Sequence, residues 1–179
     1  MIAVRKYVLA GMTSLVLTAV PASVAGAVPH AAQLPATLRI ASATQEVVND
    51  YPWANQPQDG GNDPWSYPFR ECTSFVAWRL HIRNHFEMDR FVGNANRWAD
   101  WGRGRGFAVD EHPTPGSIAQ TRNGTFGHVA WVTRVDPNGT VWVEDYNFQL
   151  TGQYLVHALG AGFVFIHVPD NTQRLGGPS

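Results

Sequence analysis

Apolar residues in the middle of the chain recur with the spacing of one helical face. Cys72, Phe75, Val76 and Leu80 stand at positions i, i+3, i+4 and i+8. This period is typical of a helix that buries one side against a core. We therefore predict a helix over residues 72–84 that begins at the cysteine.

The pattern changes toward strands further along the chain. A second short helix is predicted over 95–101, and the segments beyond Gly106 favour strands. One strand is predicted at 117–120, after a Pro-Gly turn, and a last one at 162–168. Helices that precede an antiparallel sheet indicate a single α+β domain.

Residues 128–147 carry the clearest hairpin signal. Two sets of side chains alternate over 128–135, the sequence Asp-Pro-Asn-Gly at 136–139 predicts a turn, and 140–147 runs back. Counted from the centre of that turn, the end of the returning strand lies near the start of the first.

The first residues of the chain predict export. Two basic residues precede the uncharged apolar stretch 7–20, and the small residues Ala25-Gly26-Ala27 follow. We predict a signal peptide over 1–27, with cleavage after Ala27 or, as the weaker option, after Val24. A retained membrane anchor is the alternative, but the apolar run is shorter than the roughly 20 residues of a spanning helix.

Cleavage would leave about 150 residues, enough for one domain with a core. We expect a lead-in segment over 28–50, a catalytic domain over 51–168 and a flexible tail over 169–179. The net charge is −1, with little lysine and no basic cluster. The composition therefore disfavours nucleic-acid binding, which needs clustered Lys and Arg.

Cys72 is the only cysteine, so it forms no internal disulfide. It is either a buried, inert thiol or a nucleophile. Its position at the start of a predicted helix favours the second interpretation, because unpaired N–H groups and the helix dipole stabilise a thiolate.

A base and a group that orients it are predicted on the hairpin. His128 follows Gly127 at the head of an apolar strand, where a side chain can face a cleft. Asp145 and Asn147 are two residues apart and so share one strand face, whereas Glu144 points the other way. Such a polar pair could hold the imidazole in its useful tautomer, or could simply cap a strand end.

An aromatic-rich loop precedes the cysteine. Its prolines and glycines forbid a long regular element between 51 and 71. We predict that Trp53, Trp65 and Tyr67 bind substrate beside the helix start. The alternative is that these rings cover the core, where large aromatic side chains are common.

Six motifs, in order along the chain, resemble those of the CHAP family, the cysteine- and histidine-dependent amidohydrolases and peptidases. The resemblance covers about 51–168 and rests on Arg70–Arg79, Asn94–Ala99, Pro115–Ala119, Gly127–Val132, Glu144–Asn147 and Gly162–His167.

The resemblance implies a papain-like α+β fold in which Cys72 is the nucleophile and His128 the base. Asn147 matches the asparagine of the family. Asp145 stands where the family usually has Glu; because Asp is one methylene shorter, Glu144 is the alternative partner of His128.

The implied activity is hydrolysis of an amide bond in bacterial peptidoglycan through a thioester, by a secreted, cell-wall-associated enzyme that we expect to be monomeric. The bond is left open between the muramoyl–L-alanine amide and a peptide bond of the stem or cross-bridge, as is the target, the cell's own wall or a competitor's. A catalytically silent wall-binding or toxin-associated module is the alternative function.

We predict no cofactor and no metal. Some phage-derived members bind calcium through an Asp-x-Asp-Gly loop, but here Trp65 and Ser66 replace its second Asp and its Gly. His81 and His85 have the i, i+4 spacing of a zinc pair but lack a third ligand, so an exposed helix face is the better interpretation.

Overall fold

The computed structural model describes residues 48–171, and its first helix lies where the apolar spacing predicted it. Helix α1 spans Cys72–Asn84. It begins after Glu71, which is extended, and ends at His85, whose left-handed backbone (φ 49°) lets its N–H bond to the carbonyl of Leu80. The predicted signal peptide, most of the lead-in and most of the tail lie outside the described residues.

The second predicted helix is present but consists of two parts. A 3₁₀ turn, η2 (Ala95–Arg97), continues directly into α2 (Trp98–Gly104). The helix was predicted to end at 101, before Gly102, but it continues through Gly102 and ends at Gly104. Gly102 is buried within α2, and a Cβ there would lie 2.7 Å from the side chain of Ile166, so close packing explains this glycine.

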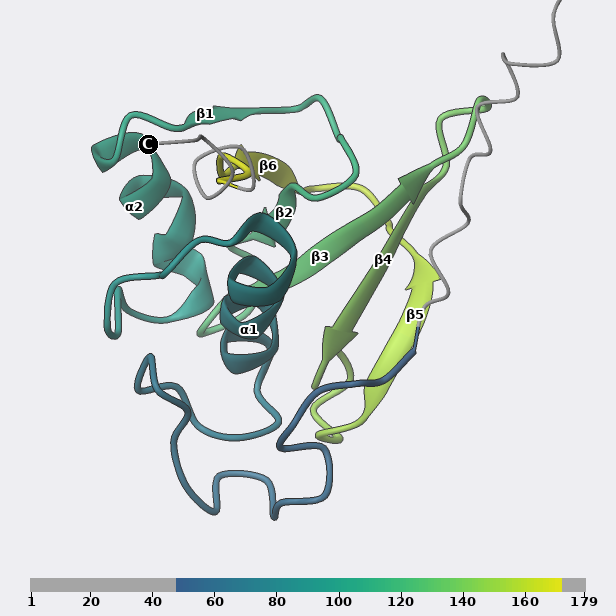
Figure 1. Ribbon diagram of the computed structural model, residues 1–179. Helices are drawn as coiled ribbons and strands as arrows, with labels where there is room; N and C mark the ends of the chain where they lie inside the picture. The colour runs from purple at the N-terminus through teal and green to yellow at the C-terminus, as the bar shows by residue number, and fades with distance from the viewer. Residues whose placement is uncertain (1–47, 172–179) are drawn as a thin grey trace, which may run out of the picture. The chain divides into compact units, whose positions relative to one another are not determined.

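Six antiparallel strands form one sheet in the order β1-β6-β2-β3-β4-β5. The strands are β1 (Ala108–Asp110), β2 (Ile118–Thr121), β3 (His128–Val135), β4 (Val141–Tyr146), β5 (Tyr154–Ala158) and β6 (Val164–His167). Figure 1 shows α1 lying across β3 and β4, and α2 beside β1 and β6. The α+β prediction is confirmed, whereas β5 was not predicted.

The β3–β4 hairpin contains a β-bulge that determines which side chains face His128. Next to the turn, Arg134 pairs with Trp142, but beyond the bulge Trp131 pairs with Glu144. One extra residue in β3 shifts the pairing, and a shift of one residue exchanges the two faces of a strand. As a result, the side chains of His128 on β3 and Asp145 on β4 lie on the same face of the sheet.

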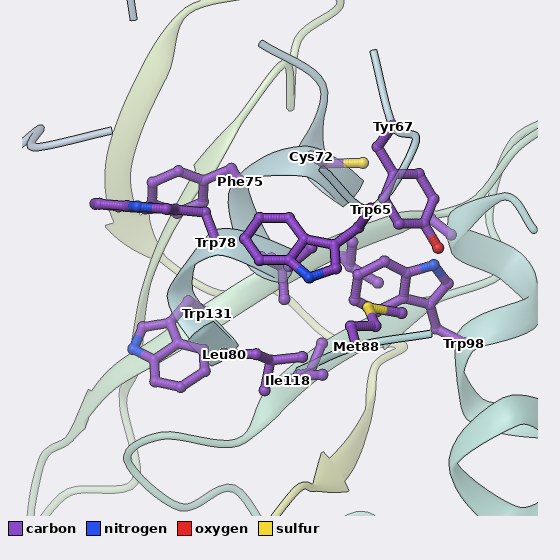
Figure 2. Close-up of a cluster of buried hydrophobic side chains, with 14 of the residues drawn as sticks. Trp65, Tyr67, Cys72, Phe75, Trp78, Leu80, Met88, Trp98, Ile118 and Trp131 are labelled. Atoms are coloured by element: carbon purple, nitrogen blue, oxygen red, sulfur yellow. The ribbon is translucent and has the colours of Figure 1, made fainter. Parts of the chain in front are cut away.

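The main hydrophobic core lies between the helices and one face of the sheet. Figure 2 shows its large side chains, which come from the loop before α1, from α1 and the segment after it, from α2 and from the strands. Trp98, Phe75 and Ile118 are fully buried there. A smaller apolar cluster includes Val132, Val143 and Phe165.

The loop that leads to α1 has no helix and only one isolated β-bridge, between Asn62 and Pro68. This confirms that its prolines and glycines exclude a long regular element. Within residues 48–171 no helix combines the length and apolar character needed to cross a bilayer.

Candidate active site

Cys72 is the first residue of α1 and is 8% exposed. The preceding Glu71 makes no side-chain cap hydrogen bond to the helix. Its carboxylate instead accepts hydrogen bonds from the side-chain amides of Asn147 (2.9 Å to each oxygen) and Gln58 (2.9 Å). The first-turn N–H groups beside the thiol are therefore free of a side-chain cap.

Gly127 positions His128 at the start of β3. Its φ of +72° is in the left-handed region, and a Cβ would lie 2.6 Å from the Thr121 carbonyl oxygen and 2.7 Å from the Asn96 nitrogen. No side chain fits there without moving backbone. The glycine thus lets the loop before His128 pack directly against β2 and η2.

The predicted contact between His128 and Asp145 is present. His128 Nε2 lies 2.9 Å from Oδ2 of Asp145, whose side chain is fully buried. Glu144 faces the other side of the sheet, where it accepts hydrogen bonds from Arg79 (2.6 Å) and the Tyr154 hydroxyl (2.7 Å). Between the two carboxylates left open by the sequence, Asp145 is therefore the one that contacts the imidazole.

The electrostatic surroundings of His128 favour its charged form. Burial by itself lowers the pKa of this ring, but hydrogen bonds to Asp145 and Cys72, together with the charges of both groups, raise the pKa from 6.5 to about 10. Because Nε2 is bonded to Asp145, Nδ1 is the nitrogen left to exchange a proton with the thiol.

Asn147, the other member of the predicted polar pair, makes hydrogen bonds to residues other than His128. β4 ends at Tyr146, and Asn147 has a φ of +61° that turns the chain away from the strand face. Its Oδ1 accepts a hydrogen bond from the Gly152 N–H (2.7 Å), while its amide nitrogen holds Glu71. Asn147 therefore ties the loop after β4 to the residue before Cys72.

Two further side chains, which the sequence did not reveal, also lie at this site. His157 on β5 places Nε2 3.1 Å from Oδ2 of Asp145, and Phe148 packs against the rings of both His128 and His157. Leu155 pairs with Asp145, so a predicted strand at 154–158 would have placed His157 on the same face. Because that segment was not predicted as a strand, the sequence did not place His157 beside Asp145.

Two of the three aromatic residues that were predicted to bind substrate are buried. Trp65 is 5% and Tyr67 1% exposed, and both lie within the core cluster of Figure 2. The reason is physical: their rings supply the large apolar surface that covers α1. Trp53 is only partly buried and stacks on Phe69, with ring centroids 5.5 Å apart.

The two motifs considered for metal binding make other contacts. Asp63 accepts a hydrogen bond from the Tyr67 N–H (2.8 Å) through Oδ1, and His81 Nδ1 is paired with Glu87. In the part of the chain that the structure describes, no three His, Cys, Asp or Glu side chains are grouped as a metal site requires.

A cysteine at a helix start and a histidine on an antiparallel sheet, with a polar side chain that orients the histidine, fit the predicted papain-like α+β fold. Residues 62–147 match the model of the CHAP domain family. This segment of the chain is therefore similar to a CHAP domain.

The curated relatives and a solved structure are bacterial. Staphylococcal secretory antigen ssaA2 of Staphylococcus aureus is 38% identical over 106 residues, covering 56% of this chain and 38% of the relative. SsaA of Staphylococcus epidermidis is 35% identical over 106 residues, covering 56% and 40%. The chain thus spans well under half the length of these relatives.

An N-acetylmuramoyl-L-alanine amidase from Staphylococcus aureus has a similar fold. The TM-score is 0.51 with 22% identity, and the match covers 56% of this chain and 30% of that chain. At this level of identity, the likeness concerns the fold.

Proposed function

We propose that this protein is a secreted hydrolase that cleaves an amide bond of bacterial peptidoglycan through a Cys72 thioester. The observation that carries the proposal is the hydrogen bond between His128 and the buried Asp145, together with Cys72 at the start of α1, which helps to raise the pKa of the same imidazole. The fold shared with an amidase and the match of residues 62–147 to the CHAP domain model support the substrate class. The names of the relatives, secretory antigens, support export.

In the proposed reaction, the thiolate of Cys72 attacks the amide carbonyl carbon while His128 is protonated. The C–N bond breaks as the imidazolium gives its proton to the leaving amine. His128, now neutral, takes a proton from a water molecule that attacks the thioester. The tetrahedral intermediate then releases the acid and expels the Cys72 thiolate, which restores the starting pair of thiolate and protonated His128. Atoms and protons balance over the two half-reactions.

The oxyanion of each tetrahedral intermediate would be held by the Cys72 N–H at the start of α1. The absence of a side-chain cap from Glu71 supports this role, because such a cap would compete for the same donors. Asn147 and Gln58 keep the Glu71 carboxylate bonded to themselves, away from the developing negative charge.

Asp145 would serve to orient His128. With Oδ2 accepting a hydrogen bond from Nε2, the ring presents Nδ1 to the thiol and is stabilised when it becomes positive. Trp53 remains a candidate for contact with the glycan or the stem peptide, since it is the predicted aromatic that is not fully buried.

The test compares wild-type protein with Cys72→Ala on purified cell walls. We expect turbidity to fall with the wild type and not with the variant, whereas His112→Gln, at a histidine whose side chain is 89% exposed, should act like wild type. Equal loss of turbidity with Cys72→Ala would refute the thioester mechanism. Wall binding without cleavage by the wild type would favour the silent module.

Mass spectrometry of the released fragments would then identify the bond. A stem peptide with a free L-alanine amino group, together with a glycan that carries a free lactyl carboxylate, would indicate the amidase reaction. New termini within the peptide would indicate an endopeptidase.

A further inference from the structure

Asp145 accepts hydrogen bonds from two imidazole rings on one oxygen. His128 Nε2 lies 2.9 Å and His157 Nε2 3.1 Å from Oδ2, and the carboxylate is fully buried. Among the described residues, its other oxygen, Oδ1, has no hydrogen-bond partner. Since a buried carboxylate is costly unless it is paired, the two rings supply its hydrogen bonding and its counter-charge.

Both ring nitrogens of His157 face hydrogen-bond acceptors. Nε2 faces the Asp145 carboxylate, and Nδ1 lies 3.1 Å from the carbonyl oxygen of Ala158. Both partners are acceptors only, so both contacts are hydrogen bonds only when each ring nitrogen carries a proton. The doubly protonated ring is an imidazolium cation.

The ring contacts of His157 fit a positive charge. Phe148 packs over it with centroids 4.6 Å apart and planes inclined by 30°. The face of an aromatic ring is negative and attracts a cation. The same phenylalanine meets His128 in an edge arrangement at 5.2 Å, so one side chain packs against both imidazoles.

We propose that His157 is a positioning residue, an imidazolium that holds Asp145 through the same carboxylate oxygen that bonds to His128. The inference rests on the proposed function, because Asp145 acts there by orienting His128. A thiolate, two imidazolium rings and one carboxylate sum to zero charge. Without His157 the buried cluster would carry one excess negative charge, and the carboxylate would be free to rotate about its remaining bond to His128.

The test uses two substitutions that separate the hydrogen bond from the ring. His157→Gln keeps an N–H donor near the position of Nε2 but no charge, whereas His157→Phe keeps a ring that can pack on Phe148 but has no donor. Because the lost hydrogen bond is to a charged group, we expect His157→Phe to lower kcat roughly 10- to 100-fold. His157→Gln should retain intermediate activity.

His112→Gln is the matched control, because it makes the same change at an exposed histidine and should leave kcat unchanged. KM should change little in either His157 variant, since the side chain contacts Asp145 rather than the amide to be cut. Wild-type kcat in His157→Phe would refute the proposal. Equal losses in both variants, matched by equal losses of melting temperature, would show a purely structural role and also refute it.

A second measurement does not depend on wall cleavage. In ¹⁵N-histidine-labelled full-length protein at neutral pH, we expect one ring with both nitrogens protonated to disappear from the spectrum of His157→Gln. A His157 signal with one unprotonated nitrogen would contradict the proposal. If wild-type protein does not cleave walls, the proposed function fails, while this measurement still decides the state of His157.

Discussion

Replacing Asp145 with Asn is the most direct test of how the site is oriented. The substitution preserves shape but removes the charge and one of two equivalent oxygens. In wild type, Oδ2 accepts hydrogen bonds from two rings, while Oδ1 is buried without a partner among the described residues. The asparagine amide has to place its oxygen and its NH₂ group in these two unlike positions.

Both orientations of the amide are costly. With the oxygen toward the histidines, the NH₂ group takes the place of Oδ1, a buried position without a hydrogen-bond partner among the described residues, and two neutral hydrogen bonds replace charged ones. Hydrogen bonds to charged groups contribute about 1.5–3 kcal/mol, which corresponds to roughly 10- to 100-fold in rate.

In the flipped orientation, the NH₂ group would face Nε2 of His128. The ring would then have to accept a hydrogen bond at Nε2 and carry its proton on Nδ1, where it cannot take the proton of Cys72. An incorrect tautomer of this kind costs up to about 10⁴-fold. We therefore expect Asp145→Asn to lower kcat by about 10²- to 10⁴-fold with little change in KM.

The assay is the rate at which soluble fragments are released from purified walls, with urea unfolding as the measure of stability. Glu144→Gln is the matched control, one residue away on the opposite strand face. It removes the charge that faces the fully buried Arg79, so stability should fall by up to about 3 kcal/mol while kcat of the folded protein is retained. Wild-type kcat in Asp145→Asn, or a loss of kcat in Glu144→Gln instead, would refute the assigned strand register.

Three further predictions concern packing and charge. Gly127→Ala should lower both stability and kcat, measured by thermal melting and fragment release, because its Cβ would clash with the Thr121 carbonyl oxygen. Trp65→Ala should cost about 3–5 kcal/mol of stability, with normal activity per folded molecule. Trp53→Ala should raise KM with only a small loss of stability. The reverse pattern would contradict the argument from burial. The pKa of His128 is raised from 6.5 to about 10, so its contribution to stability is complete below pH 6.5 and lost as the pH rises through 10; urea unfolding of wild type and His128→Gln should converge over that window.

Local patterns in the sequence were sufficient for the elements that carry the site. The apolar period that starts at Cys72 predicted α1 with its observed bounds, because a helix that buries one face repeats within a few residues. Alternation and a turn signal predicted the β3–β4 hairpin, and the parity of the strand placed Asp145 and Glu144 on opposite faces. These features depend on residues that are close together in the chain.

Which carboxylate meets His128 depended on a feature that the sequence did not reveal. The pairs next to the turn, continued without interruption, would place Glu144 on the face of His128. The β-bulge between Val132 and Arg134 inserts one residue and brings Asp145 to that face instead. Counting from a turn centred between Asn138 and Gly139 predicted Asp145 correctly. However, the observed pairing next to the turn differs from that count by one residue, and the bulge shifts it by one more.

The remaining corrections arise from contacts between residues distant in sequence. Trp65 and Tyr67 are aromatic residues of a kind that can line a binding surface, but in the folded chain their rings are buried in the core. Asn147 left its strand through a left-handed backbone conformation, and His157 reached Asp145 from a strand with no clear signal of its own. Burial, backbone conformation at a strand end and pairing between strands are properties of the assembled chain, so only the tertiary structure decided them.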